Sequence, residues 1–220
     1  MDLLKKIPDK KLRDYINKRI QRIEGFGYRI VLIDKQRIIE GKSTYGGLFD
    51  EENKELTVAI GGEYLQWIPI FIHETCHLDQ TIEKCEAWQN IQNCYRDDCA
   101  VTVFFRWLDD KKKYSDDIVF KAISATRDYE LDCEMRVAKE IINNKLDKIL
   151  NLSMINQQAN AYIYFYNVMY FTRKWYSKNF RSNKVKKLWK MMPDHFDNDY
   201  TMLPIDYYRQ CLKHCYKKKK

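Results

Sequence analysis

The pattern His73-Glu74-Thr75-Cys76-His77 constrains this chain more than any other feature of its sequence. Residues four apart lie on the same face of a helix, so the imidazoles of His73 and His77 can bind one metal ion. Glu74 follows His73 directly and can reach a water molecule at that ion as a general base. The flanking residues fit a buried helix, which favours this interpretation over a surface helix with two unrelated histidines.

The length and composition indicate one domain, or one domain with an appendage. The 220 residues are 45% hydrophobic and 32% charged, which suits a soluble protein with a sizeable core. No run of about 18 apolar residues occurs, so we expect neither a transmembrane helix nor a membrane partner. Residues 1–8 lack the apolar segment of a secretory signal. We therefore expect a cytoplasmic protein, in the host cytoplasm if it is viral.

The seven cysteines are odd in number and include no Cys-x-x-Cys pair. Without a secretory signal, this usage predicts reduced thiols. Cys211, His214 and Cys215 could form part of a second metal site, but a partner pair at zinc-finger spacing is missing. We interpret Cys76 as a small core residue, because it points away from the ligand face of its helix.

The charge is concentrated in the last third of the chain. Residues 151–220 contain 14 Lys or Arg and 4 Asp or Glu, a net charge of +10, whereas the whole chain carries +8. Residues 1–150 therefore carry −2. A basic segment of this kind could contact nucleic acid. A solvated face followed by a disordered tail at Lys217–Lys220 is the favoured interpretation.

Hydrophobic periodicity and turn residues predict a helical protein with a small sheet. The strands precede the His-Glu-x-x-His helix, which we expect to begin near Trp67 or Ile68 so that Pro69 lies in its first turn. Gly41–Gly47 is predicted to be a loop. The other expected helices span residues 9–24, 100–108, 116–142, 155–176 and 205–216, and the first expected strands span 28–33 and 36–40. Residues 48–56 are expected to form a strand, a polar turn and the start of a second strand that continues over 55–60.

Two histidines are too few for a catalytic zinc ion, which usually takes three protein ligands and a water molecule. A third histidine about eleven residues later would indicate a metzincin, but the next histidine is His195. The string HETCHLDQ is somewhat similar to the motif of peptide deformylases, which have a cysteine ligand upstream. No cysteine precedes Cys76. A carboxylate from residues 127–134 is the best remaining source.

Over residues 48–145, the sequence resembles the gluzincins, metallopeptidases with HExxH and a downstream glutamate. It also resembles small uncharacterised metallopeptidases of phages and large viruses. The resemblance implies a zinc cofactor with Glu130 as third ligand, and Glu134, four residues later, as the partner that hydrogen-bonds His73. At the position of Glu134, the family usually has Asp. Asp132 and Glu134 are the alternatives to Glu130 as the third zinc ligand. Asp79 is a further candidate for orienting a ligand.

The implied fold is an α+β, mainly helical zincin-like domain at residues 1–150 with a small mixed or antiparallel sheet. A helical C-terminal extension at residues 151–220 is expected to pack on it. The implied activity is hydrolysis of a peptide or protein substrate, with Glu74 moving the proton. Glu55–Ile60 could be an edge strand that pairs with the substrate. Candidates for stabilising the oxyanion are Asn160, Tyr162, Tyr164, Arg173 and His195.

Two other functions remain open from the sequence. One is a metal-binding viral or structural factor without catalytic activity, whose function would not need Glu74. The other is a DNA-associated protease that uses the basic C-terminal third to find protein on DNA. Nucleic acid is therefore a possible partner, although not the favoured one.

Overall fold

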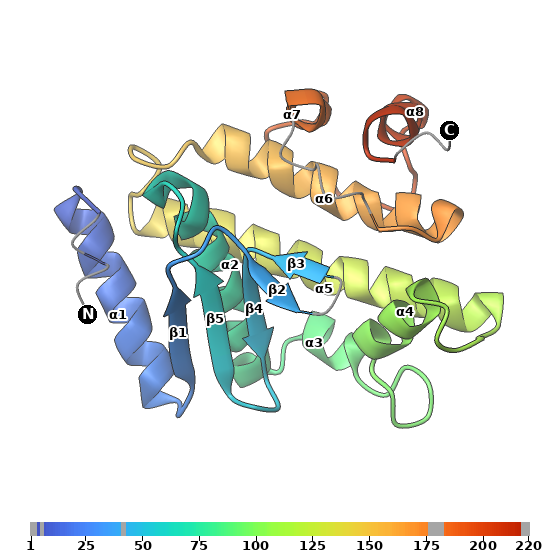
Figure 1. Ribbon diagram of the computed structural model, residues 1–220, viewed down its shortest axis with the longest axis horizontal. Coiled ribbons are helices and arrows are strands. Elements are labelled where there is room, and N and C mark those ends of the chain that lie inside the picture. The colour runs from blue at the N-terminus through green and yellow to red at the C-terminus, as the bar shows by residue number, and fades with distance from the viewer. Residues whose placement is uncertain (1–3, 5–6, 41–42, 176–182, 217–220) are drawn as a thin grey trace. The chain divides into compact units, whose positions relative to one another are not determined.

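The computed structural model of the protein describes residues 4, 7–40, 43–175 and 183–216 (Figure 1). It is an α+β protein with a small mixed sheet, as predicted. The predicted disordered tail at Lys217–Lys220 lies outside the described residues. Among those that are described, no helix is both long and apolar enough to cross a membrane.

The chain forms two compact units. The N-terminal unit comprises Met1–Cys85 and Arg136–Leu150, and the C-terminal unit comprises Glu86–Met135 and Asn151–Lys220. The predicted domains, residues 1–150 and 151–220, stay a prediction. In this grouping, residues 86–135 belong with residues 151–220.

The N-terminal unit is built on a three-stranded sheet with the order β1-β5-β4. Strand β1 (Arg29–Ile33) is parallel to β5 (Glu55–Ala59), and β4 (Gly47–Asp50) is antiparallel to β5, so the sheet is mixed. Helix α1 (Lys10–Gly25) packs against β1, and α2 (Tyr64–Glu83) packs against β4 and β5. A separate antiparallel pair is formed by β2 (Ile38–Glu40) and β3 (Ser43–Tyr45).

Three predictions for this unit were wrong. Strand β5 is central, and β4 is an edge of the sheet in the described part of the chain, so Glu55–Ile60 is not an edge strand. The predicted loop at Gly41–Gly47 contains β3 and the start of β4, with residues 41–42 outside the described part. Helix α2 begins at Tyr64, which places Pro69 in its second turn. Pro69 has no N–H to donate to the carbonyl of Leu65, which is an exposed residue.

The C-terminal unit consists of helices. They are α3 (Glu86–Ile91), α4 (Ala100–Leu108), α5 (Asp116–Asn143) up to Met135, α6 (Leu152–Thr172), α7 (Asn183–Trp189) and α8 (Ile205–His214). The apolar core of this unit gathers Phe104 of α4, Phe165 and Tyr166 of α6 and Tyr207 of α8. Helices α4, α5 and α8 agree with the predicted ranges to within two residues, because each has a clear apolar stripe.

A buried ion pair joins α1 to the helix that carries the histidines. The guanidinium of Arg19 donates to the carboxylate of Asp79 at 2.7 Å, and the Arg22 guanidinium donates to the same carboxylate at 3.0 Å. The side chains of Arg19 and Asp79 are only 9% and 11% exposed. Arg19 also donates to the hydroxyl of Thr75 at 3.2 Å. These bonds hold one face of α2 against α1.

We predict that Asp79→Ala destabilises the protein by about 3 kcal/mol, because it leaves the buried Arg19 without its main counter-charge. The matched control is Glu55→Ala, which removes the ion pair with Arg29, a side chain that is 75% exposed. That change should cost less than about 1 kcal/mol. Urea unfolding of both variants measures the difference. Equal losses would contradict a structural role for the Arg19–Asp79 pair.

Candidate metal centre

Helix α2 presents three different faces to its surroundings. Each residue advances about 100° around an α-helix, so His77 and Gln80 lie within about 40° of His73. Thr75 and Asp79 lie about 200° and 240° from His73, on the face that contacts α1. Glu74 lies about 100° from His73, toward the sheet. The ion pair of Asp79 therefore directs the two histidines away from α1.

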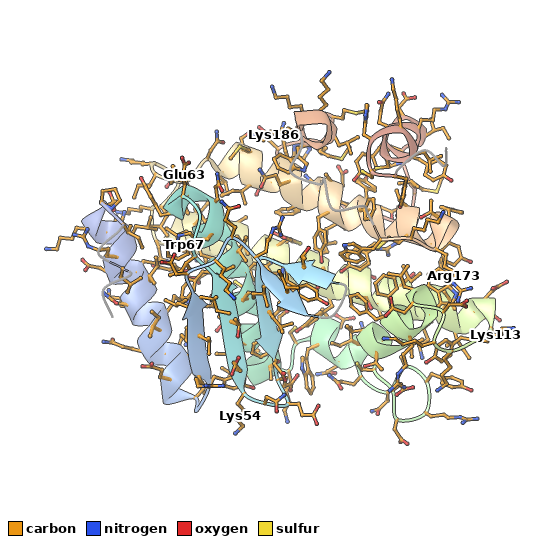
Figure 2. The ribbon with its side chains drawn as sticks, in the orientation of Figure 1. Lys54, Glu63, Trp67, Lys113, Arg173 and Lys186 are labelled. Carbon is orange, nitrogen blue, oxygen red and sulfur yellow. The ribbon has the colours of Figure 1, made fainter. Side chains whose placement is uncertain are left out.

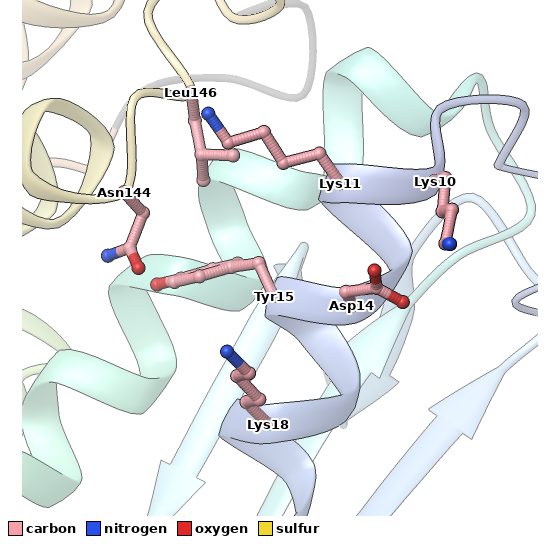
Figure 3. A pocket seen from close by; sticks show the side chains of 7 residues that line it. All are labelled: Lys10, Lys11, Asp14, Tyr15, Lys18, Asn144 and Leu146. Atoms are coloured by element: carbon pink, nitrogen blue, oxygen red, sulfur yellow. The ribbon is translucent and has the colours of Figure 1, made fainter.

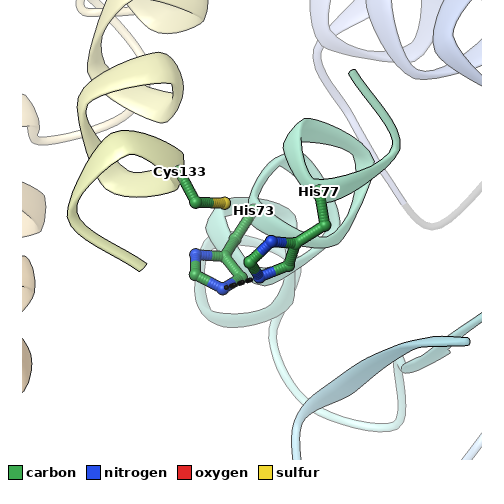
Figure 4. A group of neighbouring side chains, drawn as sticks. All are labelled: His73, His77 and Cys133. Atoms are coloured by element: carbon green, nitrogen blue, oxygen red, sulfur yellow. Dashed lines mark hydrogen bonds between the residues drawn. The ribbon is translucent and has the colours of Figure 1, made fainter. Parts of the chain in front are cut away.

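The two imidazoles are already arranged as a pair. Their Nε2 atoms are 3.0 Å apart, and the rings meet edge to face with centroids 4.7 Å apart (Figure 4). Two nitrogen ligands on one tetrahedral zinc ion would lie about 3.3 Å apart. His77 is buried and His73 is half-buried. The pair thus has both the atoms and the spacing that a metal ion needs.

Gln80 sets the orientation of His77. Its Oε1 atom lies 2.8 Å from Nδ1 of His77 in a buried position. An amide oxygen can only accept, so this contact requires the proton on Nδ1 and leaves the lone pair of Nε2 for a metal ion. The sequence analysis did not identify Gln80, although its position three residues after His77 places it on the same face.

The third member of the group is the thiol of Cys133. Its Sγ atom and the ligand nitrogens of His73 and His77 all lie within 4.8 Å of one another. Figure 4 draws Cys133 of α5 with the two imidazoles of α2. Within the N-terminal unit, Arg136 of α5 donates to the carboxylate of Glu83 in α2 at 2.7 Å.

The three predicted carboxylates are not members of this group. Glu130, Asp132 and Glu134 are half-buried residues of α5. Glu130 lies about 60° around the helix from Cys133, whereas Asp132 and Glu134 lie about 100° away on either side. The Oε2 atom of Glu130 is buried and accepts no hydrogen bond from the described residues, although the residue has other interactions. Among the described residues, His73, His77 and Cys133 form the group whose atoms could hold a metal ion.

Glu74 lies directly against the edge strand. It is 8% exposed, and a Cβ atom placed on Gly47 would lie 2.5 Å from its Cγ atom and 2.6 Å from its Oε1 atom. Only glycine leaves room at this position of β4 for the carboxylate. On the same strand, the ring of Phe49 stacks on that of His77 with centroids 6.3 Å apart. Strand β4 therefore contacts both the predicted general base and one of the predicted ligands.

Asp79 does not orient either imidazole. Its carboxylate accepts hydrogen bonds from Arg19 and Arg22, because Asp79 lies on the opposite face of α2 from the histidines. The role of Glu134 as the hydrogen-bond partner of His73 stays a prediction. Cys76 is fully buried, as expected for a core residue.

The candidates for stabilising an oxyanion all belong to the C-terminal unit. Asn160 donates to the carbonyls of Pro193 and His195, and Tyr164 donates to Asp197 at 2.9 Å. Arg173 donates to the carbonyl of Trp107 and to Asp110. These bonds hold residues 193–197 and 107–110 against α6 and its C-terminal end. His195 is exposed, and Tyr162 is hydrogen-bonded to the hydroxyl of Tyr166.

The cysteines near the C-terminus belong to the core. Cys211 and Cys215 are buried one turn apart at the end of α8, and the hydrogen bond between their thiols together with burial raises the pKa of Cys211. None of the seven cysteines, all of which lie in the described part of the chain, forms a disulfide. This agrees with the predicted reduced thiols.

A hollow of about 420 Å³ lies elsewhere in the N-terminal unit, beside α1 (Figure 3). Lys10, Lys11 and Lys18 line it together with Tyr15 and Asn144. The hydroxyl of Tyr15 donates to Glu140 of α5 at 3.0 Å, and Lys11 donates to the carbonyl of Lys145 at 2.9 Å. These contacts join the end of α5 to α1, and the hollow contains none of the predicted site residues.

Comparison of the chain with protein families, with curated proteins and with solved structures gives no match.

We predict that Gln80→Leu weakens metal binding by roughly 10- to 100-fold, because it removes the acceptor that fixes the His77 tautomer. Competition with a chromogenic chelator measures the affinity. Gln66→Leu is the matched control, since Gln66 is exposed in the first turn of the same helix. The tautomer argument fails if both variants bind metal as tightly as the wild type.

Proposed function

We propose that the protein is a zinc-dependent hydrolase that cleaves peptide bonds, with a zincin-like N-terminal unit. The observation that carries this proposal is the group of His73, His77 and Cys133, whose ligand atoms lie within 4.8 Å of one another. The buried Glu74 directly follows His73 in α2. Two imidazoles and a thiolate are a ligand set that suits zinc. They leave a fourth coordination position for water or substrate.

A bound zinc ion would acidify water and polarise the substrate carbonyl. His73 and His77 would hold it through Nε2, and Gln80 would keep Nδ1 of His77 protonated. Cys133 would bind as the thiolate, and its negative charge would offset part of the charge of the ion. The packing of α2 against α1 holds the two imidazoles in place.

Glu74 is the group that would move the proton. Its carboxylate would accept a proton from water during attack and return it to the leaving amine. The backbone of Gly47 limits where that carboxylate can lie, since the two are in direct contact. Burial against β4 also reduces the number of rotamers that Glu74 can adopt, which favours a reproducible position for the base.

The position of β4 at the edge of the sheet supports a peptide as the substrate. Strand β4 pairs with β5 on one side only within the described residues, and its first residue contacts Glu74. An extended peptide that pairs with the other side of β4 would pass close to the proposed base. The sequence analysis assigned the pairing with substrate to Glu55–Ile60, which contains the central strand β5.

Cys133 as third ligand predicts a spectroscopic signature. Cobalt added to the apoprotein should give a sulfur-to-cobalt charge-transfer band, and Cys133→Ser should lose that band and bind metal more than about 100-fold more weakly. Glu130→Ala should change the affinity less than about threefold. Cys94→Ser, at another buried cysteine, serves as the control. A wild type without the band, together with a large effect of Glu130→Ala, would instead assign the third ligand to Glu130.

For Glu74→Gln, we expect full zinc content and a loss of peptide hydrolysis of roughly 10²- to 10⁴-fold. Gly47→Ala should also retain zinc and lose activity, because the added methyl group displaces the Glu74 carboxylate. Zinc is measured by elemental analysis, and hydrolysis is measured with a pool of internally quenched peptides. The control is Glu63→Gln, an exposed glutamate just before the same helix (Figure 2).

Activity of Glu74→Gln equal to that of the wild type would exclude the proposed mechanism. A zinc-loaded wild type that cleaves none of the peptides would favour a metal-binding protein without peptidase activity.

A further inference from the structure

Four aromatic rings from three helices of the C-terminal unit form a continuous row. Phe120 of α5 contacts Tyr170 of α6 with ring centroids 5.7 Å apart, and Tyr170 contacts Phe171 at 5.4 Å. Phe171 in turn contacts Tyr208 of α8 at 6.0 Å. The interplanar angles are 66–73°, so the rings meet edge to face. We call Phe120, Tyr170, Phe171 and Tyr208 the aromatic row.

The row lies at the surface. Phe120 is 56% exposed and Phe171 is 64% exposed, while the two tyrosines are partly buried against the core of the unit. Ile205 and Leu212, three residues before and four residues after Tyr208 on α8, are also exposed. Exposing these two phenylalanine rings to water costs free energy. Such a surface indicates that a partner covers it.

The exposed charges near the row in the sequence are mainly positive. Lys121 follows Phe120, Lys174 follows Phe171 by three residues, and Arg209 and Lys213 follow Tyr208; all four are exposed. The acidic residues Asp116, Asp117 and Asp206 belong to the first turns of α5 and α8, where they interact favourably with the helix dipoles. Asp206 also lies 3.5 Å from Arg209. Along the sequence, residues 151–220 carry a net charge of +10.

We propose that the aromatic row and its flanking cations bind a single-stranded nucleic acid. Unpaired bases are flat and apolar on their faces, and they stack on exposed aromatic rings without regard to sequence. Phosphates need the cations that flank the row. A partner protein with an apolar patch would cover the rings, but it would not by itself account for the charge of +10 in residues 151–220. Duplex DNA hides its base faces and leaves the rings no partner.

The experiment is fluorescence anisotropy of the full chain with a labelled oligothymidylate and a labelled oligouridylate. We expect binding that weakens with salt, and a decrease in affinity of roughly 100-fold for the double variant Phe120→Ala/Phe171→Ala, because each ring stacks one base. Phe171→Trp should retain the affinity, since it preserves a ring for stacking. Lys174→Ala/Lys213→Ala should reduce the salt slope by about 0.7 for each phosphate that is no longer neutralised.

Phe26→Ala is the matched control, because Phe26 is an exposed ring of the N-terminal unit. Glu74→Gln should bind as the wild type does, so failure of the hydrolase proposal leaves this one standing. The proposal is overturned by no binding at low salt, by equal affinity of the double ring variant, or by a preference for duplex DNA. It is also overturned if sedimentation shows a dimer that Phe171→Ala dissociates, since a second copy would then cover the row.

Discussion

The ion pair between Arg19 and Asp79 is the interaction on which the geometry of the N-terminal unit depends. A helix that is buried on every side can rotate about its axis with little change in buried area. The second half of α2 is such a helix, since residues from Glu74 to Gln80 are all buried although most of them are polar. A buried charge pair permits one rotation only, because any other leaves Asp79 or Arg19 without a partner. That rotation directs Glu74 toward β4 and places His73, His77 and Gln80 on a different face of α2.

The second constraint acts at Gly47, where the backbone of β4 directly contacts the side chain of Glu74. Strand β4 approaches α2 so closely that a single methyl group would collide with Glu74. Helix α2 is therefore held on one face by charge and on another by direct contact with an edge strand. The Arg136–Glu83 ion pair joins the last third of α5 to α2. Each restraint comes from a different segment, so the orientation of α2 depends on the N-terminal unit as a whole.

The sequence predicted most helices and four of the strands in the described part of the chain, but it missed β3 and did not predict how the strands pair. Helices α1, α4 and α5 have strong apolar stripes and clear ends, whereas α3 and α7 are one to two turns long and were missed for lack of periodicity. Strand order within the sheet is a tertiary property, so nothing local indicated that β5 is central. The start of α2 was misplaced because Pro69 was assigned to a first turn, although the hydrogen bond that it removes falls on an exposed residue.

The residues around the histidines could be predicted only where helical spacing applied. Helical angles alone place Asp79 behind the histidines and Gln80 beside them, so both assignments were within reach of the sequence. Gly47 was not, because its contact with Glu74 joins a strand to a helix. Cys133 lies in the segment that was searched for the third ligand, between Asp132 and Glu134, but only carboxylates were considered there. A thiolate and a carboxylate each contribute one negative charge, so charge balance does not distinguish them. The ligand atoms of His73, His77 and Cys133 lie within 4.8 Å of one another, which favours the thiol as the third ligand.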